Sequence, residues 1–187
     1  MKKWFALSAI AQDHPGIVAD LAELIYECDC NLEESSMTVL GSEFAVLLLL
    51  SGQGLDLERR LSSACKRLEW EKRVTVFLRP LEGEPSHYRP SERISRYELH
   101  ATGVDKAGIV ARVARCLADH GINIIEMHTH SRPEPGSGTA IYTMQIHMDV
   151  PASVGLVAFQ DQLDRIADEL HIHIELVPSS SVVSKEL

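Results

Sequence analysis

The sequence repeats itself at a spacing of 92 residues, and this repeat limits the possible folds more than any other feature of the chain. The matching segments run from residue 13 to 34 and from 105 to 126, with eight identities in twenty-two positions and no gap. Such a repeat predicts two copies of one small domain. The identical pairs are Asp13 and Asp105, Gly16 and Gly108, Ile17 and Ile109, Val18 and Val110, Ala19 and Ala111, Ala22 and Ala114, Asn31 and Asn123, and Glu34 and Glu126.

Both copies predict the same order of strands and helices. The spacing of apolar residues indicates strand, helix, two strands joined as a hairpin, helix and closing strand. This βαββαβ order is typical of the ferredoxin-like α+β sandwich, and we expect two such sandwiches packed together. We predict strands over 4–11, 32–40, 44–51 and 73–79 (which Pro80 would end), and over 94–104, 123–132, 139–150 and 171–177; we predict helices over 18–28, 57–68, 109–120 and 156–170.

The domain boundaries follow from the repeat and from the polar segment between the copies. We expect the first domain over residues 1–82 and the second over 93–178. The segment 83–92 is rich in Pro, Gly and Ser and predicts a linker, and residues 179–187 predict a flexible tail. The apolar start of the chain imitates a signal peptide, but the repeat requires it as a strand.

Charge and cysteine content narrow the class of protein. The 27 acidic residues exceed the 18 Lys and Arg residues, giving a formal net charge of −9, which argues against direct nucleic-acid binding. Four cysteines are too few for a disulfide scaffold and predict reduced thiols in a cytoplasmic protein. The apolar run 44–50 is far shorter than the ~20 residues of a membrane span.

The turn after the first predicted strand is the strongest candidate for a binding site. We expect Asp13 to cap the following helix, Pro15 to occupy an early helical position, and Gly16 to allow close approach to the backbone. The free N–H groups at the helix start would then accept a carboxylate. Asn31 begins the next strand, and we expect its amide near the same end of the domain. The alternative interpretation is an ordinary helix cap followed by a turn Asn.

The second copy repeats this constellation with one change. Asp105, Gly108 and Asn123 take the corresponding positions, while Ala107 replaces Pro15 and leaves the turn less preset, so we expect unequal ligand affinity. The second hairpin also carries an extra segment, residues 132–138, which is either a partner-facing loop or a mobile turn. The full set of candidate ligand-binding residues is Asp13, His14, Pro15, Gly16, Ile17 and Asn31 with Asp105, Lys106, Gly108, Ile109 and Asn123.

Histidine and enzyme chemistry are weaker interpretations. His128 and His130 share one face of a predicted strand, as do His171 and His173, and two histidines at this spacing can chelate a metal. No ordered metal-binding motif supports a site, so we expect these histidines at solvated or interface positions and no bound metal. No nucleophile elbow, phosphate loop or dinucleotide fingerprint is present, so we expect neither catalytic residues nor a cofactor.

Several segments together resemble the ACT-domain family. They are Asp13-His14-Pro15-Gly16-Ile17-Val18, Cys30-Asn31-Leu32-Glu33-Glu34-Ser35, Val39-Leu40-Gly41-Ser42-Glu43-Phe44 and Leu49-Leu50-Ser51-Gly52. ACT domains are regulatory modules that bind amino acids at domain interfaces. Within that family, the chain resembles two-domain ACT regulators that repress genes of glycine cleavage. That resemblance implies a small amino-acid ligand, glycine first, and a partner transcription factor through which glycine and one-carbon metabolism is regulated without direct DNA contact.

These expectations combine into one hypothesis with two rivals. The hypothesis is a cytoplasmic tandem-ACT regulator, with a homodimer covering apolar sheet surface, that binds an amino acid at the two candidate ends. One rival is a constitutive protein-interaction module that senses no ligand. The other is a metal-responsive protein that uses its strand histidines.

Overall fold

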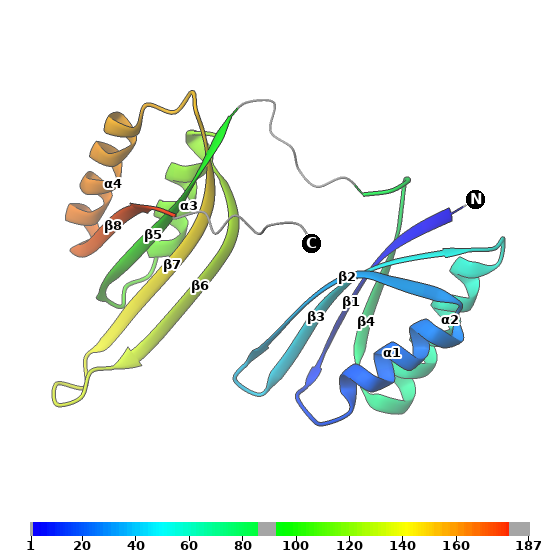
Figure 1. Ribbon diagram of the computed structural model, residues 1–187. Coiled ribbons are helices and arrows are strands. Elements are labelled where there is room, and N and C mark those ends of the chain that lie inside the picture. The colour runs from blue at the N-terminus through cyan, green and yellow to red at the C-terminus, as the bar shows by residue number, and fades with distance from the viewer. Residues whose placement is uncertain (1, 86–92, 180–187) are drawn as a thin grey trace. The chain divides into compact units, whose positions relative to one another are not determined.

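The computed structural model describes residues 2–85 and 93–179, and the chain divides into two compact units. We call residues 2–85 the first unit and residues 93–179 the second unit. Each unit is a two-layer sandwich, with one four-stranded sheet and two helices on one of its faces (Figure 1). Most of the predicted linker 83–92 and of the predicted tail 179–187 lies outside the described residues. Among the described helices, none is long and apolar enough to cross a membrane.

The two units contain the same six elements in the same order. In the first unit they are β1 (Lys2–Gln12), α1 (Ile17–Glu27), β2 (Cys30–Leu40), β3 (Glu43–Gln53), α2 (Leu57–Lys72) and β4 (Thr75–Leu81). In the second unit they are β5 (Ile94–Val104), α3 (Ile109–Asp119), β6 (Asn123–Pro133), β7 (Ala140–Pro151), α4 (Leu156–Leu170) and β8 (Ile172–Pro178).

The sheet topology confirms the predicted ferredoxin-like α+β fold. The strand orders are β2-β3-β1-β4 and β6-β7-β5-β8, and every neighbouring pair is antiparallel. The first and third strands of each unit are therefore central, and the second and fourth are edges. Both helices lie on the same side of their sheet because right-handed crossovers carry them there.

The repeat is visible in the backbone as well as in the residues. β1 and β5, and α1 and α3, begin and end 92 residues apart. The hairpins share one irregularity, because the pairing register shifts between Leu32 and Glu34 and again between Ile124 and Glu126. A bulge leaves one residue outside the ladder at each place. The two bulges thus lie 92 residues apart, the same spacing that relates the two copies in the sequence.

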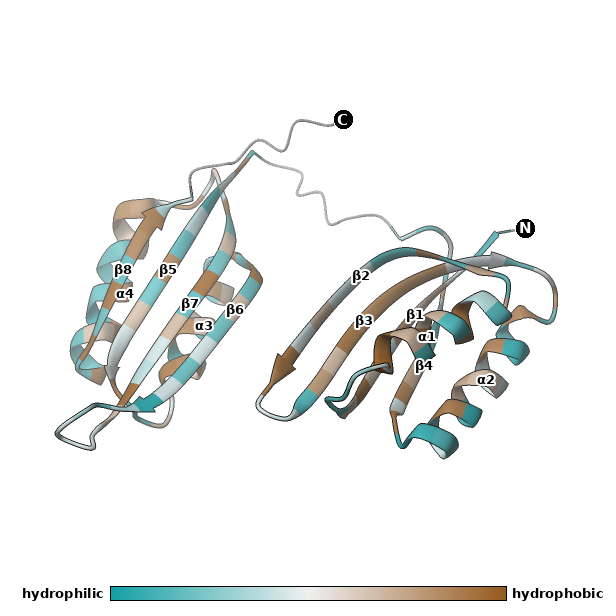
Figure 2. Cartoon of the chain, turned by 60° about the horizontal axis from the view of Figure 1, so that its bottom comes forward, coloured by the Kyte–Doolittle hydropathy of each residue, from teal (hydrophilic) through white to brown (hydrophobic). Residues whose placement is uncertain are grey.

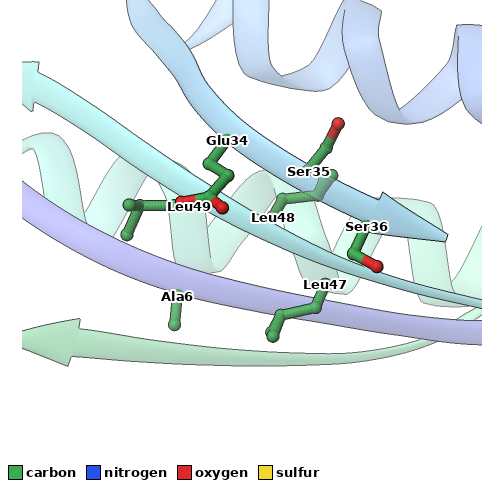
Figure 3. Close-up of a pocket in the computed structure, with 7 residues that line it drawn as sticks. All are labelled: Ala6, Glu34, Ser35, Ser36, Leu47, Leu48 and Leu49. Carbon is green, nitrogen blue, oxygen red and sulfur yellow. The ribbon is translucent and has the colours of Figure 1, made fainter. Parts of the chain in front are cut away.

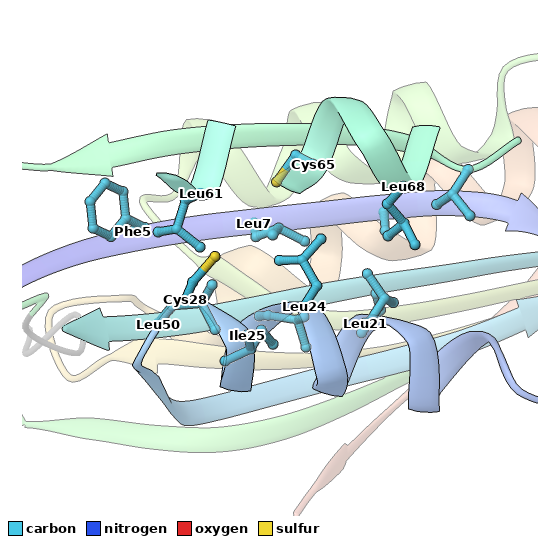
Figure 4. Close-up of a cluster of buried hydrophobic side chains, with 14 of the residues drawn as sticks. Phe5, Leu7, Leu21, Leu24, Ile25, Cys28, Leu50, Leu61, Cys65 and Leu68 are labelled. Atoms are coloured by element: carbon cyan, nitrogen blue, oxygen red, sulfur yellow. The ribbon is translucent and has the colours of Figure 1, made fainter. Parts of the chain in front are cut away.

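Each unit buries one face of its sheet beneath the helices. In the first unit Leu50 of β3 and Leu7 of β1 contact the helix residues Leu24 and Leu61, and all four are at most 4% exposed (Figure 4). Cys28 and Cys65 point into this core and pack as small apolar residues. The second unit has an equivalent core, which includes Leu99, Val113, Cys116, Ile146, Phe159 and Leu163.

The uncovered sheet faces of the two units differ in chemistry. In the first unit this open face carries Ile10, Leu47 and Phe77, which are 53%, 57% and 66% exposed. The hydrophobic colouring of β3 in Figure 2 reflects an apolar sequence on both faces of that strand. The open face of the second unit instead interleaves histidine with glutamate, as His147 stands between Glu98 and Glu126 on the neighbouring strands.

One predicted strand end is wrong. We expected Pro80 to end the closing strand of the first unit, but β4 continues to Leu81 and Pro80 lies opposite Phe5. Because β4 is an edge strand, the missing N–H of proline breaks no ladder hydrogen bond on its outer side.

Candidate functional site

The turn before α1 has a defined geometry that depends on glycine. Gly16 is the N-cap of α1 with φ 102° and ψ −15°, and the Ile17 N–H lies 3.5 Å from the His14 carbonyl oxygen. Pro15 followed by a glycine with positive φ is the pattern of a type II turn. Gly108 repeats this backbone with φ 99° and ψ −4° as the N-cap of α3. The two turns therefore share one conformation at their glycines, and only glycine adopts these angles at low cost.

The predicted roles of Asp13 and Pro15 in the helix start are wrong. No side chain caps α1, and Asp13 instead donates its backbone N–H to the Ser42 carbonyl oxygen at 2.8 Å. Pro15 belongs to the turn and not to the first helical position. The physical reason is length, because the type II turn uses the residues between Asp13 and Ile17 and moves the N-cap to Gly16.

The helix starts therefore present free backbone donors to solvent. The Ile17 N–H is used in the turn, and the Asp20 N–H binds the Gly16 carbonyl oxygen at 2.9 Å. The N–H groups of Val18 and Ala19 are therefore left without an acceptor among the described residues. A Cβ placed on Gly16 or Gly108 would meet no atom within 4 Å, so the space before each turn is open. A carboxylate at this position would meet N–H groups and the positive end of the helix dipole.

The remaining turn residues separate into exposed and buried groups. His14, Pro15 and Lys106 are exposed, whereas Ile17 and Ile109 are only 3% and 2% exposed. The two isoleucines hold the helix starts to the cores with their side chains. Their side chains are therefore not available to a ligand.

Asn31 lies at the opposite end of its unit from Asp13, which corrects our expectation. Asn31 pairs with Ser51, which pairs with Trp4 near the start of β1, while Asp13 follows the end of that strand. The intervening residues of β1 place the two groups roughly 30 Å apart at about 3.3 Å per residue. The cause is α1, which carries the chain back along the sheet before β2 begins. Asn123 is displaced from Asp105 in the same way, since it pairs with Asp149.

Charged and hydroxyl groups surround the Asn31 end. The buried Ser51 donates its hydroxyl to the carboxylate of Glu33, the residue at the bulge of β2. Lys2 Nζ lies 2.9 Å from Glu33 Oε1 and 4.4 Å from the centre of the Trp4 ring. The Ser51 hydrogen bond, followed by Lys2, lowers the pKa of Glu33. Glu33 therefore stays ionised beside Asn31.

The Asn123 end has different neighbours. Asp149, opposite Asn123, has its Oδ1 buried without a hydrogen bond among the described residues. Arg96 Nε lies 3.6 Å from that oxygen, which is close enough for an ion pair but too far for a good hydrogen bond. A buried carboxylate oxygen with spare capacity can accept from an added donor, such as an ammonium group.

The turn end of the second unit also contains a polar group that the sequence analysis missed. Tyr142 has a buried hydroxyl that makes no hydrogen bond of good geometry in the described part of the chain; burial raises its pKa, and the nearby Thr129 hydroxyl lowers that pKa by less. Nearby Asp105 raises that pKa further, and it accepts a 2.7 Å hydrogen bond from Ser131. The signal was present, because Tyr142 interrupts the otherwise apolar core-facing side of β7.

A shallow hollow lies on the open face of the first unit. It has a volume of about 250 Å³ and is lined by Ala6, Leu47 and Leu49, with Glu34 and Ser36 along one side (Figure 3). The hollow lies at mid-sheet, so it belongs to neither the turn nor the Asn31 end. Its apolar floor suits apolar contact more than recognition of a small polar ligand.

The strand histidines pair with glutamates. Glu98 Oε1 lies 3.0 Å from His100 Nε2 and 4.0 Å from His147 Nε2, and Glu126 Oε1 lies 2.8 Å from His128 Nε2. Within residues 2–85 and 93–179, no group of three or more His, Cys, Asp or Glu residues is arranged to hold a metal ion. The four cysteines are free thiols.

Comparison with known proteins assigns the family. The ACT domain matches residues 5–77 and again residues 101–172. The glycine cleavage system transcriptional repressor of Escherichia coli is 23% identical over 168 residues, which cover 90% of this chain and 86% of that protein. Among solved structures, a protein of unknown role from Galdieria sulphuraria is 28% identical with a TM-score of 0.74, covering 95% of this chain and 99% of that one. A proposed glycine cleavage system transcriptional repressor has the same fold, with 19% identity, a TM-score of 0.70, and coverage of 94% and 96%. The chain belongs to the ACT-domain family and carries two ACT domains in tandem.

Proposed function

We propose that this protein is an amino-acid-binding regulator that acts on transcription of glycine and one-carbon metabolism through a partner transcription factor. The ACT domains and the similarity to a transcriptional repressor over most of both chains support a regulatory role. Glycine is the first ligand to test. The acidic charge of the chain favours a protein partner over DNA.

The observation that carries the proposal is the pair of open, uncapped helix starts behind Gly16 and Gly108. Each exposes backbone donors at the positive end of a helix, and the space in front of each glycine is free of atoms within 4 Å. An amino acid always carries a carboxylate, whatever its side chain. Backbone donors at these positions would bind that shared group without a dedicated Arg or Lys.

The separation of Asn31 from the turn supports a site that two protomers complete. β2 is an exposed edge strand, and its far end adjoins β3 at Glu43, next to Asp13. If two copies pair through β2 in antiparallel register, Asn31 of one protomer lies beside the turn of the other. In this homodimer, the turn would bind the carboxylate while the Asn31 amide oxygen accepts from the ammonium group.

The second unit would bind with a different affinity. Its turn has Ala107 where the first unit has Pro15, so the backbone before Gly108 is less constrained. Tyr142 and Asp149 in turn add a hydroxyl and a carboxylate oxygen with free hydrogen-bonding capacity. The corresponding positions of the first unit hold Phe44 and Ser51, whose hydroxyl already donates to Glu33. Different side chains around one backbone geometry are expected to give unequal sites.

Calorimetry against all free amino acids tests the sensing role. We expect saturable binding of at least one small amino acid, and we expect Asn31→Ala to weaken binding by about tenfold, the loss of one hydrogen bond to a charged group. Gln160→Ala, which removes an amide on α4, is the matched control and should leave binding unchanged. If no amino acid binds, the sensing role is wrong, and the constitutive interaction module replaces it.

A further inference from the structure

The second hairpin is built differently from the first. β2 and β3 are joined by a tight turn at 41–42, whereas β6 and β7 are joined through residues 134–139 (Figure 1). The longer turn is tied together internally. Glu134 donates its N–H to the Thr139 carbonyl oxygen at 2.8 Å, Gly138 donates to the Glu134 carbonyl oxygen at 3.1 Å, and the Ser137 hydroxyl donates to Glu134 Oε2 at 2.7 Å. This extra segment is therefore a preformed structure, which lowers the entropy cost of binding to it.

The hairpin shapes an open groove on the uncovered face of the second sheet. The groove has a volume of about 610 Å³. Cross-strand pairing of His130 with Thr143 and of Arg132 with Ile141 places these four side chains on that face. The lining residues are His130, Arg132, Pro133, Glu134, Pro135, Ile141 and Thr143.

The groove lining contains one guanidinium group, that of Arg132, and one carboxylate, that of Glu134, and the two form no ion pair with each other. Arg132 forms no ion pair with any residue of the described chain, and Glu134, the acidic residue of the lining, accepts from Ser137 in its own turn. A guanidinium group binds a carboxylate through two parallel hydrogen bonds. Pro133 and Ile141 provide apolar surface beside that charge.

We infer that this groove binds an acidic segment of a partner protein, with a Glu or Asp carboxylate on Arg132 and an adjoining apolar side chain against Pro133 and Ile141. This inference rests on the proposed function, because it assumes that the chain acts through a partner protein. An open groove on a hairpin suits a peptide segment, because small-molecule sites bury most of their ligand. The chain as a whole has a net charge of −9 and repels acidic molecules, so attraction of such a segment requires a local site.

A peptide titration of the full chain tests this inference. The probe is a fluorescein-labelled decapeptide of alternating Glu and Ser with two Leu residues, and the control peptide has Gln in place of Glu. We expect the acidic peptide to bind with strong salt dependence in fluorescence anisotropy. Arg132→Gln should weaken peptide binding at least tenfold. Arg132→Lys keeps the charge but loses the paired hydrogen bonds of the guanidinium group, so its affinity should lie between those of the unaltered chain and of Arg132→Gln. Arg115→Gln, an exposed arginine on α3, is the matched control.

The outcomes separate this inference from the proposed function. Equal binding of the Gln peptide, or an equal loss for Arg115→Gln, would overturn the groove as a carboxylate site. Complete competition by millimolar free glutamate would also overturn it, because that result indicates a small-ligand site. Amino-acid binding by Arg132→Gln should match the unaltered chain. If amino acids fail to bind while the acidic peptide still requires Arg132, the sensing role is wrong and the groove is supported.

Discussion

Replacing Gly16 by alanine tests the turn on which the candidate site depends. The backbone of Gly16 has φ 102°, a conformation that L side chains rarely adopt, yet a Cβ there would meet nothing within 4 Å. Steric clash with the rest of the protein therefore plays no part. Any loss of stability in Gly16→Ala must come from the local backbone conformation.

The expected loss follows from two opposing terms. Holding a non-glycine residue in a left-handed conformation costs about 1–2 kcal/mol. Alanine also restricts the unfolded chain, which at a compatible site stabilises a protein by about 0.4–1 kcal/mol, but strain outweighs this gain where φ is positive. We expect a net loss of about 1 kcal/mol. With a urea m-value of about 2 kcal/mol/M, the unfolding midpoint of the first unit should fall by about 0.5 M.

Tryptophan fluorescence reports this transition selectively. Both tryptophans belong to the first unit, and Trp4 is 7% exposed whereas Trp70 is 89% exposed, so the change in emission on unfolding comes mainly from Trp4. Gly155→Ala is the control, because Gly155 has φ −71° and equally open surroundings. Its unfolding is measured by circular dichroism, since Gly155 lies in the second unit, which has no tryptophan. Because Gly155 is an N-cap like Gly16, that variant should lose only the few tenths of a kcal/mol, roughly, by which glycine is preferred over alanine at this position. An unchanged midpoint for Gly16→Ala, or an equal loss for Gly155→Ala, would refute the strain argument.

Two further predictions concern ionisable groups. Because the native pKa of Glu33 is lowered, its ionisation contributes stability above the pKa of the unfolded carboxyl, and this contribution is lost as the pH falls through the native value. Ser51→Ala should raise the native pKa of Glu33, as followed by NMR titration of the side-chain carboxyl, and Ser63→Ala on α2 should not. Burial raises the pKa of Cys30 and Cys65 to about 11, so both thiols should react slowly with iodoacetamide at pH 8 in the native protein and rapidly in urea, as read by mass spectrometry. Rapid native alkylation of Cys65 would contradict its burial.

The fold was predictable because the repeat and the apolar spacing agree. Self-similarity indicated two domains, and the alternation of apolar and polar residues, as in Ile146 and Met148 against Gln145 and His147, distinguished strands from helices. The strand end at Pro80 was missed because sequence does not distinguish an edge strand from a central one. That distinction requires the order of strands in the sheet.

The site was harder to predict than the fold because it depends on three-dimensional placement. Gly16 was expected to allow close approach to the backbone, and the structure adds that its positive φ forms the turn. Asp13 was placed as a helix cap and Asn31 at the turn end of the unit, and both placements were wrong. The length of α1 compared with β1 decides which end of the sheet Asn31 occupies. Ser51 and Asp149 could not be connected with the asparagines, because only the pairing register brings them opposite.

The differences between the two units have a consequence for regulation if both bind the same amino acid. The backbone turns at Gly16 and Gly108 are alike, so the free energy of binding a carboxylate should be similar at both. The neighbouring side chains differ, so the rest of the ligand should be bound with unequal free energy. Two unequal sites fill at different ligand concentrations, and the protein would then respond over a wider range than two identical independent sites allow. A ligand shifts the protein toward the state it binds more tightly, so each filling step can change partner binding separately.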